Sequence, residues 1–243
     1  MFCITVNFES RQLVVPGTLL AEGKYNVGFN SGAYKEGDKV YSSVVGLAEL
    51  RNDSISVIPL RGCYIPYPGD LVIGKVVEVA STAWILDIRS PYEGVLFAKE
   101  FLSKPLNTLK EDARQYLDIG ESVIAKVISF DRTRNPSMST REQGLGKIQR
   151  GTVIDVDFTR VPRIIGKKGS MINLLKKESG CQIFVGQNGR VWISGRSRDE
   201  EAVVSEAVRK IEAEAHTTGL TDRIQEYFEK RKGGSHGKET DNR

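Results

Sequence analysis

The fold of the C-terminal part of the chain is decided by one stretch, Val161-Pro162-Arg163-Ile164-Ile165-Gly166-Lys167-Lys168-Gly169-Ser170. Two glycines enclose two lysines directly after an isoleucine pair, and a helix is predicted to begin at Ser170. Glycines let another backbone come close and permit positive φ, and the amides at a helix start carry partial positive charge. The stretch therefore predicts a cradle for a sugar-phosphate backbone, with Ile164 and Ile165 as an apolar floor for bases.

The elements predicted around this loop follow the order β-α-α-β-β-α. Ser197 followed by Glu200 is a capping-box signature and predicts the start of the last helix. Trp192, in an alternating strand, is expected in the core. The other predicted elements are a strand over 152–158, a short helix over 163–165, a helix over 170–178, and strands over 182–185 and 191–194.

Two segments follow this pattern at the C-terminus. A further helix is predicted over 219–231, with Leu220, Ile224, Tyr227 and Phe228 on one side. We expect this stripe to dock on the preceding domain rather than on a partner. Residues 232–243 are polar and rich in glycine, a composition that predicts disorder.

The charge is distributed unevenly along the chain. The whole chain has 35 basic and 31 acidic residues, and this small excess alone does not indicate a nucleic-acid partner. Residues 147–198, however, contain eleven basic residues against three acidic ones, whereas residues 199–214 contain two against six. Basic charge gathered around one loop is typical of proteins that bind nucleic acids.

Residues 1–147 are predicted to form two modules made mainly of β-strands. Residues 1–65 alternate short apolar runs with turn signals, which predicts a compact β-rich domain. Residues 66–147 contain five short predicted strands with a polar insert over 99–117, a pattern that fits a small Greek-key barrel of the OB type. A glycine-rich hinge is expected over 144–147. The fold class is thus multidomain, mainly β with an α+β domain at 148–218.

Several kinds of chemistry are not expected from this composition. The chain has only two histidines, His216 and His236, and three scattered cysteines without a Cys-x-x-Cys pair, so zinc ligands at the usual spacings are missing. Asp155 and Asp157 alternate along one strand and could bind magnesium, but an exposed strand face explains them better. We therefore predict no catalytic residues, no metal and no cofactor. No apolar run reaches the length of a membrane span, and we expect a cytoplasmic protein.

Residues 150–216 resemble a KH domain of the βααββα type in their element order, their glycine loop and their charge. In that family the Gly-x-x-Gly loop clamps about four single-stranded nucleotides. The resemblance implies an RNA-binding site made of Arg163, Ile164, Ile165, Gly166, Lys167, Lys168, Gly169 and Ser170.

Residues 66–147 resemble the OB-fold RNA-binding domain named after ribosomal protein S-one, beginning with Pro68-Gly69-Asp70-Leu71-Val72-Ile73-Gly74-Lys75-Val76. Two positions that are usually aromatic in that family hold Thr82 and Ile85, and the neighbouring Trp84 is expected to pack or to form an interface. Phe97 stands where the family usually has a histidine, and both a core position and an RNA contact remain open for it. Weak RNA binding is expected through Lys126, Arg132, Arg134 and Arg141.

The whole arrangement resembles the RNA-binding cap subunit of the archaeal RNA exosome. This resemblance implies a non-catalytic subunit whose residues 1–65 anchor it on a hexameric ring of RNase PH-like proteins. Three copies would surround the entrance of the ring and guide single-stranded RNA 3′ ends to phosphorolytic sites. Two alternatives remain open: a ribosome- or translation-associated RNA-binding protein, and an RNA-cleaving enzyme with an unrecognised site.

Overall fold

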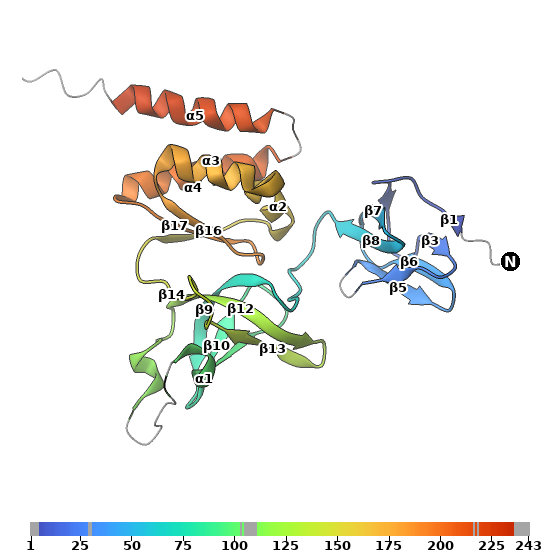
Figure 1. Cartoon of the computed structure of the whole chain (residues 1–243), viewed down its shortest axis with the longest axis horizontal. Helices are drawn as coiled ribbons and strands as arrows, with labels where there is room; N and C mark the ends of the chain where they lie inside the picture. Colours follow the sequence, from blue (N-terminus) through green and yellow to red (C-terminus); the bar gives the residue numbers. More distant parts are fainter. Residues whose placement is uncertain are drawn as a thin grey trace, which may run out of the picture. The chain divides into compact units, whose positions relative to one another are not determined.

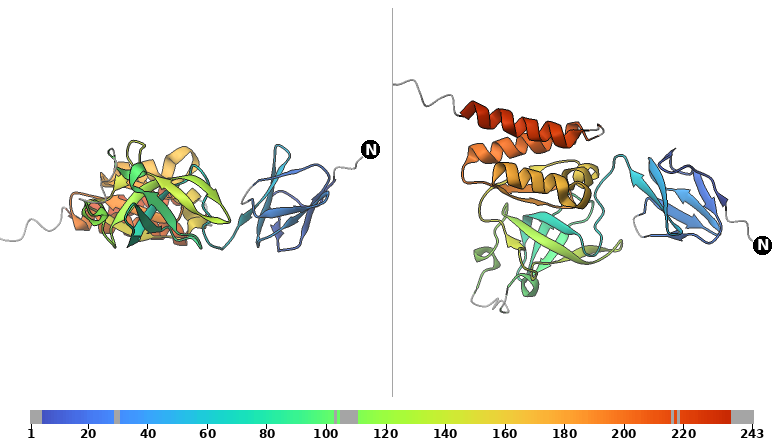
Figure 2. Two further views of the ribbon diagram at one scale, coloured as in Figure 1. Left: turned by 90° about the horizontal axis from the view of Figure 1, so that it is seen from below. Right: turned by 45° about the horizontal axis from the view of Figure 1, so that its top comes forward.

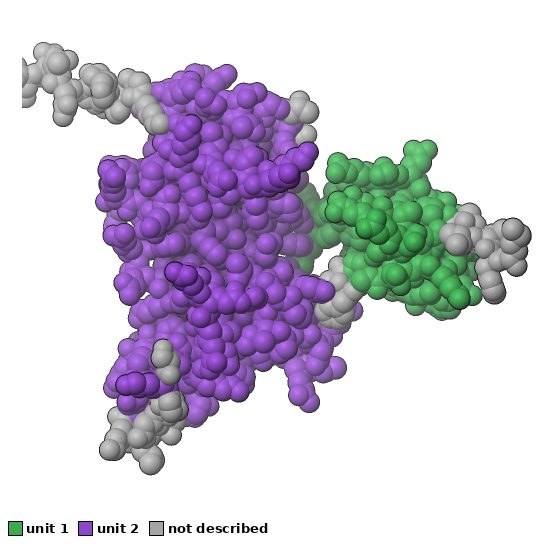
Figure 3. Space-filling view, viewed as in Figure 1, with its two compact units in different colours: residues 1–63 green, residues 64–243 purple. Residues whose placement is uncertain are grey.

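A computed structural model of the chain describes residues 5–28, 31–102, 104, 111–215, 217 and 219–235. The chain forms two compact units, residues 1–63 and residues 64–243, which Figure 3 shows in different colours. The predicted boundary after residue 65 falls slightly late, because Tyr64 is buried in the second unit and its hydroxyl donates a hydrogen bond to Asp70 Oδ2 at 2.6 Å.

The first unit consists of two four-stranded sheets around one core, as the β-rich pattern predicts. One sheet has the order β1 (Thr5–Val6), β3 (Leu19–Glu22), β6 (Lys39–Ser42) and β5 (Ala33–Glu36). The other has the order β2 (Leu13–Val14), β7 (Gly46–Arg51), β8 (Ser54–Pro59) and β4 (Asn26–Val27). The core between them includes Leu20, Val40, Ala48 and Ile55, all fully buried.

The second unit begins with the predicted barrel. Its strands are β9 (Leu71–Val79), β10 (Ala83–Asp87), β11 (Gly94–Phe97), β12 (Ser122–Asp131) and β13 (Arg134–Ser139), and pairing of β12 with β13 closes the barrel. The insert contains α1 (Ala98–Phe101) and η1 (Ala113–Gln115). Trp84 is fully buried and its Nε1 donates to the Leu117 carbonyl at 2.9 Å, so the expectation that it packs is confirmed.

The glycine-rich segment after the barrel is not the hinge that its composition suggests. β14 (Gly146–Lys147) pairs with β12 through Ile124 and Val123, which ties the segment to the barrel. Backbone pairing with Ile124 fixes Gly146 even though it has no side chain to pack. The connection between the barrel and the following domain is therefore part of a sheet.

The predicted βααββα order of the last domain is confirmed. Its strands β15 (Thr152–Asp155), β17 (Arg190–Ser194) and β16 (Gln182–Val185) form an antiparallel sheet in the order β15-β17-β16. Ser197 caps the last helix of the pattern as predicted, since its hydroxyl accepts from the Glu200 amide at 3.2 Å. The helical elements are η2 (Phe158–Arg160), α2 (Val161–Ile165), η3 (Lys167–Gly169), α3 (Ser170–Ser179) and α4 (Arg198–Ala213). Figures 1 and 2 show the long helices on one side of this sheet and the barrel on the other.

The final helix, α5 (Leu220–Ser235), docks on the same domain, as expected for its apolar stripe. Leu220, Ile224 and Phe228 are buried in the core that the sheet and the other helices share. The helix extends to Ser235, four residues beyond its predicted end at residue 231. Each residue added to a helix that packing has already fixed gains a hydrogen bond without a new nucleation cost. The rest of the predicted tail lies outside the described residues.

Candidate nucleic-acid interface

The loop between α2 and α3 has a backbone that only glycine adopts readily at its first position. Gly166 ends α2 with φ 75° and ψ 170°, a region that is essentially reserved for glycine. A Cβ atom here would lie 2.6 Å from the Met171 nitrogen and 2.8 Å from the Met171 Cβ. The first glycine of the loop is therefore required by the turn itself.

The two lysines of this loop face solvent. Lys167 and Lys168 are exposed, and Lys168 has left-handed backbone angles, φ 54° and ψ 30°. Gly169 follows with φ 79°, and the exposed Ser170 is the first residue of α3. Two exposed lysines thus directly precede the first amides of α3, an arrangement that suits an anionic backbone.

The two isoleucines before the loop have different environments. Ile164 is fully buried among the core residues of the domain, so the prediction that it offers a floor for bases is wrong. Helix α2 is short, and packing directs this side chain inward against the sheet and the other helices. Ile165 is half-buried and keeps part of its surface free. Arg163 is exposed, and its Nη2 donates to the Thr217 carbonyl at 2.8 Å.

We expect Gly166→Ala to lower the free energy of unfolding by about 2 kcal/mol, because the alanine Cβ would meet Met171 in a region of φ and ψ that disfavours it. Gly169→Ala is the matched control. It also has positive φ, but its nearest non-local atom would be 3.6 Å away, so a loss of about 1 kcal/mol is expected. Thermal unfolding compares the two variants, and equal losses would contradict the asymmetry of the loop.

The barrel residues predicted to contact RNA fall into two groups. Phe97, at the end of β11, is 39% exposed, and Lys99 Nζ lies 5.8 Å from its ring centroid. Arg141 donates to the Lys99 carbonyl at 2.8 Å, which brings it to the same region. Lys126, in β12, pairs with Ser139, the last residue of β13, and Arg141 follows two residues later. Arg132 and Arg134 are exposed at the turn between β12 and β13, at the opposite end of β13.

Acidic side chains accompany two of these cations. Lys126 forms an ion pair with Glu142, and Arg141 Nε lies 3.4 Å from Glu100 Oε2. Neutralisation by neighbouring carboxylates weakens the attraction of these cations for phosphate. The glycine loop of the last domain is therefore the more favourable anion site of the two.

A set of contacts that the sequence did not predict joins the barrel to the last domain. Asn188, in the turn between β16 and β17, is 1% exposed. Its Nδ2 donates to the carbonyls of Ile73 and Ile88 at 2.8 and 3.0 Å, and its Oδ1 accepts from the Ile73 amide at 3.3 Å. An Asn-Gly pair signals only a turn in the sequence. Here the turn inserts into the barrel wall.

Arginines from both sides complete this junction. Arg190 is buried, donates through Nη1 to the Asp87 carbonyl at 2.6 Å, and forms an ion pair with the Asp87 carboxylate. Arg89 Nη1 donates to the carbonyls of Val156 and Gly189, both at 2.8 Å. Burial acts to raise the pKa of Asp87, but the Arg89 amide and the Arg190 guanidinium outweigh it and hold that pKa below its usual value. The barrel and the last domain are thus joined by buried, charge-assisted hydrogen bonds.

Among the residues that the structure describes, no group of three or more histidine, cysteine, aspartate or glutamate side chains is arranged to hold a metal ion. None of the helices in the described ranges is both long enough and apolar enough to cross a membrane.

Family models match the first and the last domain of the chain. Residues 11–61 match the family described as the exosome RNA binding protein RRP4 N-terminal domain, and residues 151–213 match the KH domain family. A crystal structure described as an exosome complex RNA-binding protein has a TM-score of 0.67 and 39% sequence identity, covering 70% of this chain and 98% of that one.

Curated relatives are similar over most of their length. The protein of Pyrococcus furiosus named exosome complex component Rrp4 is 44% identical over 89% of this chain and 82% of its own. The protein of the same name from Saccharolobus solfataricus is 44% identical over 93% of this chain and 90% of its own. That of Sulfurisphaera tokodaii is 42% identical over 94% and 92%, respectively.

Proposed function

The chain belongs to the Rrp4 family of exosome complex components, and on this premise we propose that it is a cytoplasmic, non-catalytic RNA-binding subunit. It captures single-stranded RNA 3′ ends and delivers them to a phosphorolytic 3′–5′ exoribonuclease ring. The observation that supports RNA capture most directly is the loop at 166–169, where two exposed lysines sit at the start of α3. Backbone phosphates are the ligand that this combination of charge and amides favours.

The first unit is proposed to anchor the chain on the ring. The outer face of the sheet formed by β2, β7 and β8 has an unusually apolar surface for a soluble domain. Leu13, Leu47 and Ile58 lie side by side across the three strands, and Val15, Val45 and Leu60 follow at the next outward positions. We call these six residues the apolar face. Leu13 is 59% exposed and Ile58 is 44% exposed.

A contiguous apolar patch of this kind marks a protein interaction site. The strands β2, β7 and β8 already pair with one another, so this face offers side chains rather than free backbone groups. Side-chain burial is the main contribution to a stable interface between subunits. We assign the apolar face to an RNase PH-like ring subunit, because the relatives of this chain are named as components of the exosome complex. Three copies on one hexameric ring remain part of this proposal.

Reconstitution tests the proposed function. Single-stranded RNA is incubated with phosphate and with the purified chain alone, the purified ring alone, or both together. We expect the chain alone to leave the RNA intact, the ring alone to shorten it slowly, and the mixture to shorten it faster at low RNA concentration. Shortening by the chain alone would make it an enzyme. Association with ribosomal subunits and not with the ring would favour a translation-associated RNA-binding protein.

A further inference from the structure

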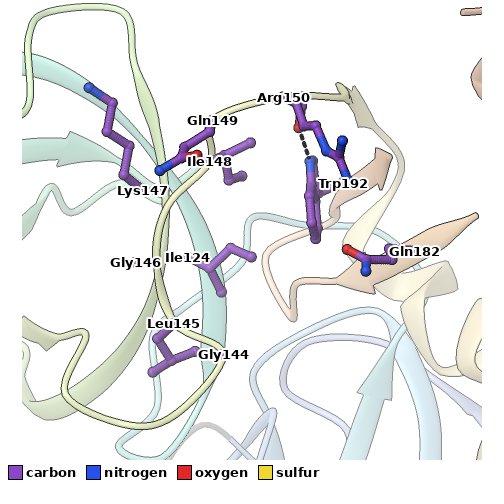
Figure 4. A pocket seen from close by; sticks show the side chains of 10 residues that line it. All are labelled: Ile124, Gly144, Leu145, Gly146, Lys147, Ile148, Gln149, Arg150, Gln182 and Trp192. Atoms are coloured by element: carbon purple, nitrogen blue, oxygen red, sulfur yellow. Dashed lines mark hydrogen bonds between the residues drawn. The ribbon is translucent and has the colours of Figure 1, made fainter. Parts of the chain in front are cut away.

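A pocket of about 240 Å³ opens between the barrel and the sheet of the KH domain. One wall comes from β12 and the segment around β14, and the other comes from β16 and β17 (Figure 4). Its size is below that of pockets for drug-sized ligands, so it suits a single planar ring. The lining residues are Ile124, Gly144, Leu145, Gly146, Lys147, Ile148, Gln149, Arg150, Gln182 and Trp192.

Trp192 forms the KH-domain wall of this pocket. Its neighbours in β17, Val191 and Ile193, are fully buried against the helices, so Trp192 points to the helix-free face of the sheet. It pairs with Val153 of β15 and Phe184 of β16 across the sheet. The prediction that Trp192 belongs to the core is wrong: the side chain is only half-buried.

The orientation of the Trp192 indole is fixed by the chain beside it. Its Nε1 donates to the Arg150 carbonyl at 2.8 Å. A Cβ at residue 151 would lie 2.7 Å from that Nε1 and 2.3 Å from the Ile193 carbonyl oxygen, so the close approach requires Gly151. The polar edge of the indole is therefore satisfied within the protein, and an aromatic face remains. Figure 4 shows the ring nearly edge-on, with this face turned toward Ile124 and Ile148.

The polar groups around the pocket favour an anionic ligand that contains a ring with hydrogen-bonding groups. Among the described residues, none that lines the pocket carries a carboxylate, and the exposed Arg150 lies beside Trp192 (Figure 4). The amides of Gln149 and Gln182 offer both donors and acceptors. Lys147 points away from the pocket and pairs with Glu121 at 2.6 Å, which leaves Arg150 as the cation beside Trp192.

We propose that this pocket binds one base of single-stranded RNA by stacking it on Trp192, with Arg150 at the adjoining phosphate. The site lies on the helix-free face of the KH sheet, apart from the loop at 166–169, which joins two helices on the other face. It therefore adds a second contact to the same strand of RNA. Stacking of a base on an aromatic side chain tolerates any base, which suits a protein that handles RNA ends of varied sequence. The inference rests on the proposed function, because it takes RNA as the ligand.

Tryptophan fluorescence of the full chain tests the pocket directly. The chain has two tryptophans, and Trp84 is fully buried in the barrel. We titrate the chain with a short oligoadenylate and measure binding independently by fluorescence anisotropy of a labelled oligonucleotide. We expect quenching of the emission that Trp192→Phe removes, while Trp84 serves as the constant internal signal.

A matched pair of variants measures the contribution to affinity. Trp192→Leu should weaken oligoadenylate binding about tenfold, the loss of one stacked base. Phe184→Leu removes an aromatic side chain from the same sheet face without touching the pocket and should leave the affinity within about twofold. Both variants should unfold near the temperature of the unchanged chain, because both side chains are only half-buried.

The outcomes separate this inference from the proposed function. If anisotropy reports binding but the Trp192 emission does not change, the pocket proposal is overturned and RNA capture stands. If anisotropy reports no binding at all, RNA capture itself is contradicted, and with it the proposed function. Equal losses of affinity in the Trp192→Leu and Phe184→Leu variants would place RNA on the sheet face as a whole and would overturn the pocket as the specific site. Quenching by ring subunits without RNA would make the pocket a protein contact, which also overturns the proposal.

Discussion

Replacing Lys167 and Lys168 together by aspartate should weaken the binding of single-stranded RNA about a hundredfold at low salt. Both side chains are exposed at the loop before α3, where two phosphate contacts would be lost and two negative charges gained. Because each lysine–phosphate contact releases counterions, the slope of log affinity against log salt should fall by about two. Filter binding or anisotropy at several salt concentrations measures both quantities.

The fold should survive this double substitution. Lys168 has φ 54°, a left-handed conformation that aspartate tolerates better than most residues. Lys176→Asp with Lys177→Asp is the matched control, because it makes the same charge change in the last turn of α3, where both lysines are exposed. We expect the control to lower the affinity only a few fold. Equal losses in the two double variants would show a diffuse charge effect and count against the loop as the site.

Local signals explain why much of this domain could be predicted from the sequence. The N-cap at Ser197 and the Gly-Lys-Lys-Gly loop each act within one turn of the chain, and the structure has both where they were expected. The reciprocal bond of a capping box is shifted by one residue, because the Glu200 carboxylate accepts from the Arg196 amide. The alternation of strand residues likewise identified β16 and β17. Such features depend on neighbours in sequence, and a single sequence contains all of the information that they need.

Side-chain direction could not be predicted where two faces are both apolar. Ile164 and Ile165 are adjacent in a five-residue helix, which is too short for its period to show which one faces the core. Trp192 alternates with Val191 and Ile193, so the strand pattern leaves open which face the helices cover. Only the packing of α3 and α4 on one side of the sheet decides both cases.

The junction of barrel and KH domain depends on contacts between residues distant in sequence. Asn188 bonds to Ile73 and Ile88, and Arg190 bonds to Asp87. Nothing near Asn188 in the sequence distinguishes this turn from an exposed one. Because buried hydrogen bonds join the two domains, the glycine loop and the Trp192 pocket are held in one compact unit.

A carboxylate placed on the apolar face of the first unit should prevent assembly with the ring. We expect Leu13→Glu with Ile58→Glu to weaken ring binding at least a hundredfold, since burying one unpaired charge in an apolar interface costs about 3 kcal/mol or more. Leu13 and Ile58 flank Leu47 on the outer face and make little contact with the core, so the unit should remain folded. Size-exclusion chromatography of the chain mixed with ring subunits measures the assembly.

The control for this prediction uses the other sheet of the same unit. Tyr34, in β5, is 45% exposed, and its ring centroid lies 5.6 Å from that of Tyr41, on which it stacks. Tyr34→Glu therefore places a charge at an exposed position outside the apolar face. It should leave assembly unchanged, whereas Ile58→Glu alone should weaken it. All of these variants should keep the RNA affinity of the isolated chain, because the loop at 166–169 belongs to the other unit. Full assembly of the Leu13→Glu and Ile58→Glu double variant would move the anchoring surface away from β2, β7 and β8.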